Sequence, residues 1–381
     1  MTREAIVIGA GIGGAAAALA LRHIGWRATV LERAPVLGEI GAGMSQAPNA
    51  LRALDALGVG EQARSAGVPT HAAGNLRTPD GRYLQRARPG DVTAMLAFHR
   101  ADLHRVLLDA LPGSWVRTGA EVTGLRQEAD RAAVGFGDGE LTADLVVAAD
   151  GIRSTVRRLL WPDAPPPRFL GRTAWLGIAE VTDLPGSITL GPGGYFLIHP
   201  LGRGRAYWAY VTTASQPNVR SDQEKTELIR RIGTWHDPIP RLIEATPTEA
   251  LIRIDIHDLD PLPSYVTGRV ALLGDAAHAM SPDRGQGAGQ SIEDAVVLAT
   301  ALAGESTVDA ALRRYDADRR PRTQTTARGA RKDGHRTTSQ AAHRAMVTMI
   351  RMTPASLWRK GIAPDGNPTW RWRPPLLPDR T

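Results

Sequence analysis

The sequence predicts an α/β fold: a discontinuous Rossmann-like nucleotide-binding domain with an inserted β-sheet domain and C-terminal helices. Three observations predict it. A strand–helix–strand unit with a glycine-rich turn occupies residues 4–33. Further glycine-containing strand–helix segments lie at 145–160 and 269–303. Between them, residues 172–213 alternate apolar and polar side chains, as half-buried strands do.

The N-terminal unit is the clearest part of the pattern. Residues 4–8 (EAIVI) are largely β-branched and end at Gly9, which favours a short buried strand. Residues 12–24 are rich in alanine and stop before Gly25, which favours a helix. Residues 27–31 (RATVL) are typical of a second strand. Together these elements span about the 30 residues that a βαβ unit occupies.

The later elements follow from the same periodicity and breaking residues. Strands are expected within 70–95, 115–148, 172–213 and 269–273. Helices are expected at 49–57, 102–111, 221–233 and 291–303, and through most of 306–350. The residues after 350 are expected to be irregular, because prolines stand at 354, 364, 368, 374, 375 and 378.

Composition excludes several classes of site. The 381 residues include no cysteine, which rules out disulfides, thiolate metal ligands and a cysteine nucleophile, and fits a cytoplasmic protein. The net charge is +7, yet residues 313–381 alone hold 16 basic and 5 acidic side chains. We interpret this segment as an exposed arginine-rich helix face rather than a nucleic-acid patch. Residues 5–21 are uncharged but fall short of the ~20 apolar residues that a bilayer requires, so no membrane span is expected.

The first motif is the glycine pattern at Gly9, Gly11 and Gly14, placed between a strand and a helix. In a G-x-G-x-x-G turn the first glycine allows the tight bend, the second admits a pyrophosphate, and the third lets helix and strand pack closely. Glu32 ends the second strand, 18 residues after Gly14. A carboxylate there accepts hydrogen bonds from ribose hydroxyls and repels a 2′-phosphate, so FAD or NAD is expected rather than NADP.

Two further motifs each follow a strand. The hydrophobic run 145–149 delivers Asp150 to a glycine turn; Asp150 or Ser154 is alternatively only the N-cap of the next helix. The run 269–273 ends at Gly274, where a side chain would block a ligand, and at Asp275, which can bind a polyol chain. The loop Gly285–Gly289 then opens a helix whose N-terminal dipole favours negative charge.

In this order the three motifs identify a family resemblance. The chain resembles the single-component FAD-dependent aromatic hydroxylases, flavoprotein monooxygenases with the p-hydroxybenzoate hydroxylase fold. It is most similar to their salicylate, 3-hydroxybenzoate and urate hydroxylase branch. The matching segments are GAGIGG (9–14) with Glu32–Arg33, ADGIRSTVR (149–157), LLGDAAHAMSPDRGQGAGQSIEDA (272–295), and more weakly GAGMSQAPNALRAL (41–54) and HRADLHRVLL (99–108).

The resemblance implies noncovalent FAD and a role for each matching residue. The implied cofactor-binding residues are Gly9, Gly11 and Gly14 at the pyrophosphate, Glu32 and Arg33 at the adenosine ribose, Val122 at the adenine, Ser45 and Arg100 on the flavin side, Asp150 for both FAD and NAD(P)H, Asp275 at the ribityl or pyrophosphate, and the loop from Gly285 with Gly287 and Ala288 at the flavin pyrimidine. His99, His104 and His278 are expected to be structural.

The resemblance also implies three domains. They are an FAD-binding domain from residues 1–70, 96–165 and 265–305, a β-rich substrate domain from 71–95 and 166–264, and a C-terminal helical segment with an irregular tail from 306–381. The substrate domain should carry two strands within 193–213, joined by a turn at 202–204, that roof the flavin. Alternation places Arg205 on one face of the second strand and Tyr210 on the other.

Arg205 and Tyr210 are the candidate catalytic residues. Arg205 matches the place of a functional arginine in the urate hydroxylase branch and would orient an anionic ring; it is alternatively a surface residue at a turn. Tyr210 would bond the substrate, although tyrosines in strands are usually packing residues. No metal is expected.

The implied reaction takes hydride from NADH or NADPH, forms a flavin C4a-hydroperoxide with O2, and hydroxylates an electron-rich aromatic or heteroaromatic small molecule. A monomer or homodimer is expected. The alternatives are an epoxidase or reductase on the same scaffold, or a non-catalytic RNA-associated flavoprotein that uses the basic C-terminal segment. A flavin halogenase is disfavoured, because residues 370–375 (WRWRPP) lack the isoleucine of its W-x-W-x-I-P motif.

Overall fold

The computed structural model describes residues 2–38, 43–88, 95–137, 139–182, 184–218, 223–338 and 340–378. Within these residues a sheet of six strands has the order β18–β19–β12–β1–β2–β8. Its strands are β1 (Glu4–Ile8), β2 (Arg27–Leu31), β8 (Val116–Arg117), β12 (Leu145–Ala148), β18 (Val266–Thr267) and β19 (Val270–Leu272). All neighbours pair in parallel except β18 and β19. Three distant parts of the chain therefore build one Rossmann-like sheet, which confirms the predicted fold class.

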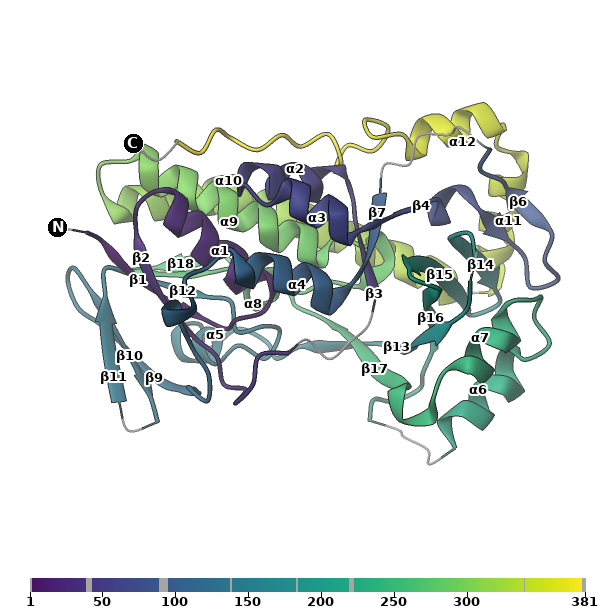
Figure 1. Cartoon of the computed structure of the whole chain (residues 1–381), viewed down its shortest axis with the longest axis horizontal. Coiled ribbons are helices and arrows are strands. Elements are labelled where there is room, and N and C mark those ends of the chain that lie inside the picture. The colour runs from purple at the N-terminus through teal and green to yellow at the C-terminus, as the bar shows by residue number, and fades with distance from the viewer. Residues whose placement is uncertain are drawn as a thin grey trace.

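Helices cover one face of this sheet and a small antiparallel sheet covers the other (Figure 1). The helices are α1 (Ile12–His23), α2 (Pro48–Ala56), α3 (Gly60–Ala66), α4 (Arg100–Asp109), α9 (Gly287–Gly304) and α10 (Val308–Thr338). The small sheet consists of β9 (Val122–Gln127), β10 (Ala132–Phe136) and β11 (Gly139–Ala143). Because both faces are covered, the parallel strands β1 and β12 are apolar and buried along almost their whole length.

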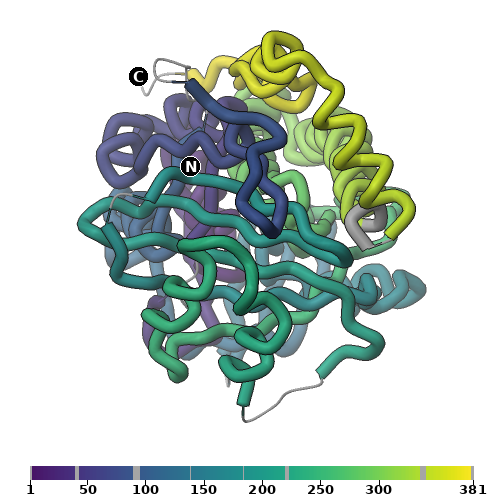
Figure 2. The backbone as a smooth tube through the Cα atoms, turned by 90° about the vertical axis from the view of Figure 1, so that its right-hand side faces the viewer, coloured from purple at the N-terminus to yellow at the C-terminus, as the bar shows by residue number. Residues whose placement is uncertain are grey.

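A second sheet forms the other half of the molecule. Where the chain is described, its seven strands have the order β17–β13–β16–β15–β14–β5–β6. They are β5 (Leu76–Arg77), β6 (Tyr83–Gln85), β13 (Arg168–Glu180), β14 (Ser187–Gly191), β15 (Gly194–Gly202), β16 (Arg205–Thr213) and β17 (Ile252–Asp258). Figure 2 looks onto this half and shows the green segment of α6 (Glu224–Ile232) and α7 (Ile239–Ala245) in front of the teal strands.

A three-stranded sheet, β3 (Gly43–Gln46), β7 (Met95–His99) and β4 (Val68–Thr70), connects the two halves. It lies against the face of the seven-stranded sheet that α6 and α7 leave free, since Ala97 packs in one cluster with Tyr207 and Ala209. Short helices α5 (Thr155–Leu160) and α8 (Asp275–His278) follow β12 and β19. The strands that precede Asp150 and Asp275 are thus each followed by a helix, as expected. The limits of the three domains stay a prediction.

The C-terminal segment differs from the expectation. After α11 (Gln340–Met352), residues expected to be irregular form the helix α12 (Ala355–Ile362). Pro354 does not break this helix, because it occupies the N-cap position, where no helical N–H is needed. The rest of the tail runs back along the helical layer toward the end of the molecule that carries the N-terminus (Figure 1). Its Trp372 and Leu377 pack against the apolar core of the six-stranded sheet.

Several expected element boundaries also moved. Helix α9 begins at Gly287 rather than at residue 291, so the glycine-rich loop contributes its first turn. The first two residues of the helix expected at 221–233 lie outside the described residues, and α6 spans Glu224–Ile232. The strands 4–8 and 27–31 have the bounds that the pattern predicted.

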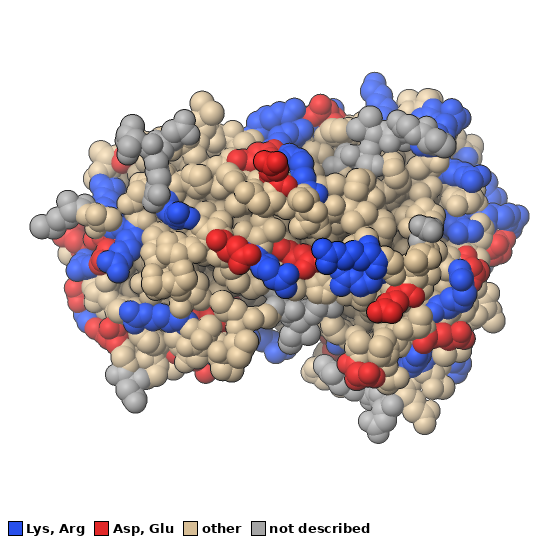
Figure 3. Space-filling view, viewed as in Figure 1, with Lys and Arg blue, Asp and Glu red and all other residues tan. Residues whose placement is uncertain are grey.

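The arginines of the C-terminal segment do not form a simple exposed face. Arg319 is only 1 % exposed and pairs with two carboxylates of α9, and Arg331 pairs with the buried Asp258. On the face shown in Figure 3, basic and acidic side chains are interspersed. Within the described part of the chain, no helix is both long and apolar enough to cross a bilayer.

Candidate functional site

The glycine-rich turn after β1 has a backbone that only glycine tolerates. Gly9 has φ +96°, and a Cβ there would lie 2.5 Å from the Ala149 carbonyl oxygen. A Cβ at Gly14 would lie 1.8 Å from the Gly9 carbonyl oxygen. Gly9 and Gly14 thus allow α1 to pack directly onto the end of β1, between β12 and β2. The turn lies at the carboxyl ends of parallel strands, where nucleotides bind in such sheets.

Glu32 is fixed beside this turn by two backbone hydrogen bonds. The Ala10 N–H donates to Oε2 over 2.8 Å, and the Ala34 N–H donates to Oε1 over 2.9 Å. Each carboxylate oxygen has further lone pairs, so Glu32 can still accept hydrogen bonds from ribose hydroxyls. The carboxylate therefore fits the ribose-binding role that its spacing predicted.

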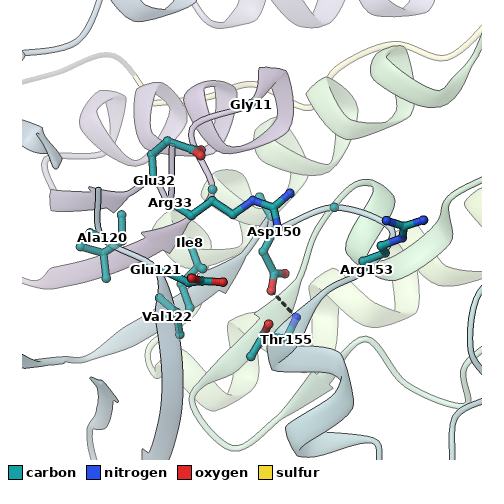
Figure 4. Close-up of a pocket in the computed structure, with 14 residues that line it drawn as sticks. Ile8, Gly11, Glu32, Arg33, Ala120, Glu121, Val122, Asp150, Arg153 and Thr155 are labelled. Atoms are coloured by element: carbon teal, nitrogen blue, oxygen red, sulfur yellow. Dashed lines mark hydrogen bonds between the residues drawn. The ribbon is translucent and has the colours of Figure 1, made fainter. Parts of the chain in front are cut away.

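A cavity of about 200 Å³ opens on one side of Gly11 and Glu32 (Figure 4). It brings together the predicted residues Gly9, Gly11, Glu32, Arg33, Val122 and Asp150. It also contains residues that the sequence analysis did not single out: Ile8, Leu31, Ala120, Glu121, Ala149, Gly151, Arg153 and Thr155. Most of these residues stand next to predicted residues in the sequence. They could have been found by extending each motif by one or two positions.

Asp150 combines a capping role with an uncommitted oxygen. Its Oδ2 accepts hydrogen bonds from the Thr155 N–H (2.8 Å) and the Val156 N–H (3.2 Å), while Ser154 Oγ accepts from the Arg157 N–H. Both proposed N-caps of α5 are thus used. The other oxygen of Asp150, Oδ1, is buried and has no partner among the described residues. A buried acceptor of this kind is ordinarily satisfied, so this oxygen fits a ligand donor.

A second cavity, of about 360 Å³, adjoins the first at Gly11 and Glu32. It contains the predicted Arg100 together with Ala10, Ala34, Val36, Leu37, Gly38 and His104. A dinucleotide has two halves joined by a pyrophosphate, and two adjoining cavities that meet at the glycine-rich turn match that form. The two cavities, with the carboxylates of Glu32 and Asp150, fit FAD.

The remaining predicted cofactor residues gather at the start of α9. Asp275 is exposed, and none of the described residues donates a hydrogen bond to its carboxylate. A Cβ on Gly287 would lie 3.9 Å from Asp275 Oδ1, and one on Gly285 would lie 3.6 Å from Ser45 Oγ. Ala288 is partly buried against the core. Because α9 is 18 residues long, its N-terminus presents a positive dipole end to this place.

The structure gives a reason for Gly274 that the sequence analysis did not foresee. Its φ is +63°, and a Cβ there would lie 2.6 Å from Ser291 Oγ on α9. The glycine is therefore required by backbone conformation and by the packing of α9. That it also leaves room for a ligand stays a prediction.

Arg205 lies on the face of β16 that is turned toward β3 and β7. Tyr207, on the same face, covers Gly43, where a Cβ would lie 2.2 Å from a Tyr207 ring carbon. The Nε atom of Arg205 is buried and has no hydrogen-bond partner among the described residues. Burial lowers the pKa of His99, and the nearby charge of Arg205 lowers it further although Asp102 opposes this. Burial also raises the pKa of Tyr207, an effect that Arg100 partly offsets.

Tyr210 lies on the opposite face of β16, as the alternation predicted. Its ring stacks on Trp175 and meets the Trp235 ring edge-on, each at 5.9 Å between centroids. It belongs to the core that α6 and α7 close. The structure therefore does not bring Tyr210 and Arg205 together, and Tyr210 stands apart from both cavities and from the start of α9.

The comparisons with known proteins cover nearly all of these elements. Residues 2–330 match the protein family described as FAD binding domain. The aurachin C monooxygenase/isomerase of Stigmatella aurantiaca is 40% identical over 324 residues, which are 82% of this chain and 84% of that enzyme. The 3-hydroxybenzoate 6-hydroxylase 1 of Aquipseudomonas alcaligenes is 36% identical over 346 residues, covering 85% and 86%.

A solved structure is similar over both halves of the molecule. It is HpxO from Klebsiella pneumoniae in complex with FAD and uric acid, with a TM-score of 0.88 and 31% sequence identity. The match covers 94% of this chain and 95% of that one. The likeness therefore includes the nucleotide-binding sheet, the seven-stranded sheet and the helices between them.

Proposed function

This chain belongs to the FAD binding domain family, and we propose that it is an FAD-dependent monooxygenase that hydroxylates an electron-rich aromatic or heteroaromatic small molecule. The observation that carries the proposal is the pair of adjoining cavities at Gly11 and Glu32. One of them contains Arg100, which directly follows His99 of β7, and Arg205 lies near His99. Relatives that act on aromatic compounds support the same class of reaction.

The chain's own residues would hold the cofactor along the six-stranded sheet. Glu32 would bind the adenosine ribose, and the turn at Gly9–Gly11 would leave room for the pyrophosphate. Asp150 Oδ1 would accept a hydrogen bond from the cofactor in the cavity that also contains Glu32 and Val122, and Asp275 would bind the polyol chain. The N-terminus of α9 would stabilise negative charge on the ring system through its free N–H groups and dipole.

Bound FAD would supply the redox chemistry, using electrons from NAD(P)H and an oxygen atom from O2. The protein must then hold the substrate ring and exclude water from it. The sheet face around Tyr207, Ala209 and Leu176 is apolar, which suits the surroundings of an aromatic ring. Arg205 adds a cationic group whose Nε is not otherwise engaged. This combination favours a substrate that carries an ionised hydroxyl, a carboxylate or a carbonyl on its ring.

The RNA-associated alternative lacks comparable support. The arginines it would need include Arg319, Arg322 and Arg331, and all three are paired with carboxylates in the folded chain. Their charge is thus compensated within the protein. An epoxidase or a reductase would use the same cofactor cavities, but no feature of the described residues favours either over a hydroxylase.

The experiment is a substrate screen with the purified protein loaded with FAD. Phenols, anthranilates, quinolones and purines are added singly while NADH or NADPH oxidation is followed. Products are analysed by mass spectrometry for one added oxygen atom. At least one compound should stimulate NAD(P)H oxidation and be hydroxylated. A protein that binds FAD yet oxidises NAD(P)H without incorporating oxygen into any of them would contradict the proposal.

Arg205→Ala tests the placement of the substrate. FAD binding should be unchanged, while NAD(P)H is still oxidised and hydrogen peroxide replaces much of the hydroxylated product. Misplacing a ring by a small distance can cost on the order of a hundredfold in rate. Arg203→Ala is the matched control, because Arg203 is an exposed residue of the same turn. Equal coupling in the two variants would make Arg205 a turn residue only.

A further inference from the structure

Two neighbouring carboxylates are buried in the middle of α9. Glu293 and Asp294 are both 0 % exposed. Two adjacent buried acids are strongly unfavourable unless cations and hydrogen bonds compensate them. The compensation comes from α10, where Arg319 is itself only 1 % exposed and Arg322 donates two further hydrogen bonds to Glu293. Arg319 Nε donates to Asp294 Oδ1, and Arg319 Nη1 donates to Glu293 Oε2, each over 2.6 Å.

The guanidinium of Arg319 is held in one orientation. Its Nη2 donates to the side-chain oxygen of Gln290 over 2.9 Å and to the Gln290 carbonyl over 3.3 Å. Burial by itself opposes the ionisation of Asp294, but His278 and Arg319 together lower its pKa to about 2. Asp294 is therefore charged at neutral pH, and a planar forked cation is the group that can serve both acids at once.

Asp294 acts in turn on the backbone that presents Asp275. Its Oδ2 accepts a hydrogen bond from the Gly274 N–H over 3.0 Å and from His278 Nε2 over 2.6 Å. Gly274 stands directly before Asp275, and His278 closes the short helix α8 that Asp275 begins. Both ends of the segment that carries Asp275 are thus tied to one carboxylate.

Glu293 acts on the other segment expected at the flavin. Its Oε1 accepts from Asn49 Nδ2 over 2.7 Å, and the same Nδ2 donates to Gln286 Oε1 over 2.9 Å. Gln290 Nε2 also bridges Glu293 Oε1 and Gln286 Oε1. Gln286 lies between Gly285 and Gly287, in the loop that opens α9. This loop therefore takes its position from Glu293 through Asn49 and Gln290.

We infer that Arg319 is a positioning residue for the flavin, although it lies on α10 behind the site. Among the described residues it is the cation that contacts both Glu293 and Asp294, with Arg322 as a second partner of Glu293 and His278 as a second partner of Asp294. These two acids fix the loop at Gln286 and the backbone before Asp275. The inference rests on the FAD-binding part of the proposed function and on no particular substrate. No motif in the sequence marks Arg319, because it stands in a segment rich in arginine.

The test compares Arg319→Gln with Arg331→Gln. Arg331 is on the same helix and pairs with the buried Asp258, but it contacts neither α9 nor the Asp275 segment. Its loss therefore reports the effect of removing from α10 an arginine that pairs with a buried carboxylate elsewhere. The readouts are the Kd for FAD, the visible spectrum of bound FAD and the melting temperature of the FAD-free protein, with binding measured well below both melting temperatures.

Arg319→Gln should raise the Kd for FAD roughly tenfold to a hundredfold, the range seen when groups behind the direct ligands of a bound metal are removed. It should also shift the flavin spectrum, whereas Arg331→Gln should lower the melting temperature with Kd and spectrum unchanged. A wild-type Kd and spectrum in Arg319→Gln would overturn the inference, and so would equal changes in both variants.

Should Arg319→Gln fail to fold, Arg319→Lys decides. An ammonium keeps the charge but cannot reach both acids as a fork does, so FAD should still bind more weakly than to the wild type. A wild-type Kd in Arg319→Lys would then overturn the inference. Because no substrate is used, a chain that binds FAD but hydroxylates nothing would contradict the proposed function and leave this inference standing.

Discussion

Glu32 and His104 hold opposite ends of the same residue, Ala10, in the glycine-rich turn. Glu32 Oε2 accepts a hydrogen bond from the Ala10 N–H over 2.8 Å, while His104 Nε2 contacts the Ala10 carbonyl oxygen at 2.5 Å. His104 is only 5 % exposed and comes from α4, far along the chain. The backbone of the turn at Ala10 is therefore held on both sides by side chains of the protein itself.

His104→Ala should weaken FAD binding by freeing one end of Ala10. A lost hydrogen bond contributes about 1 kcal/mol, which is roughly a fivefold rise in Kd. His23→Ala is the matched control, because His23 Nε2 also bonds a backbone carbonyl, that of Leu57 at 2.7 Å, but lies outside both cavities. Isothermal titration of the FAD-free variants measures the difference; equal Kd values in the two would contradict the role of His104.

Asp275→Asn should weaken FAD binding without destabilising the FAD-free protein. The carboxylate is exposed and has no partner among the described residues, so the fold does not depend on its charge. A hydrogen bond to a charged group contributes about 1.5–3 kcal/mol, or roughly a tenfold to hundredfold change in Kd. Thermal unfolding of the FAD-free protein is the control. Flavin content equal to the wild type after gel filtration would count against Asp275.

Tyr210→Phe should leave substrate KM and coupling unchanged. The hydroxyl belongs to the core beneath α6 and α7, on the face of β16 away from Arg205. Its loss should cost only about 1 kcal/mol of unfolding free energy. Urea unfolding and steady-state assays with whichever substrate the screen finds measure the two effects. A raised KM with unchanged stability would contradict this prediction and show that Tyr210 contacts the substrate.

His199 should make the protein less stable in mild acid. Its side chain is buried beside Thr70 Oγ1, 2.9 Å from Nδ1, and burial lowers its pKa to about 4. Its pKa in the unfolded chain is about 6.5, so below that pH the unfolded state binds the extra proton. The folded state therefore loses up to about 3 kcal/mol as the pH falls from about 6.5 to 4.

His199→Asn removes this titration, so its stability should fall less over the same range of pH. Urea unfolding of both proteins at pH 7, 5.5 and 4 provides the comparison, and the other titrating groups are common to both. Parallel pH dependences would show that His199 takes up its proton equally in the folded and unfolded states.

The nucleotide-binding turn was predictable because its requirements are local. Gly9 and Gly14 are set by a positive φ and by contacts within the same strand–helix unit. Strand alternation likewise placed Arg205 and Tyr210 on opposite faces. It could not decide which face points toward the cofactor, because that depends on where α6, α7 and β7 pack.

The role of Arg319 was not predictable from its own surroundings. In the chain it stands among other arginines, which favours an exposed helix face. Its burial depends on Glu293 and Asp294, about 25 residues earlier, whose own burial depends on the packing of α1, α2 and α10 around α9. Pro354 led to a wrong prediction of irregular structure after residue 350, because a proline can end a helix but can also stand at the start of one.

The order of strands in the six-stranded sheet has a consequence for how the protein matures. β1 pairs with β2 close by in sequence, but its other neighbour β12 is about 140 residues away, and β12 then pairs with β19 about 120 residues later. Pairings of such long range form slowly. The chain must therefore be synthesised past β19 and α9 before the sheet is complete. Only then can Asp150 and Asp275 lie next to the glycine-rich turn. Cofactor capture is thus a late event in biogenesis, and a nascent chain halted before residue 266 should be unable to hold FAD.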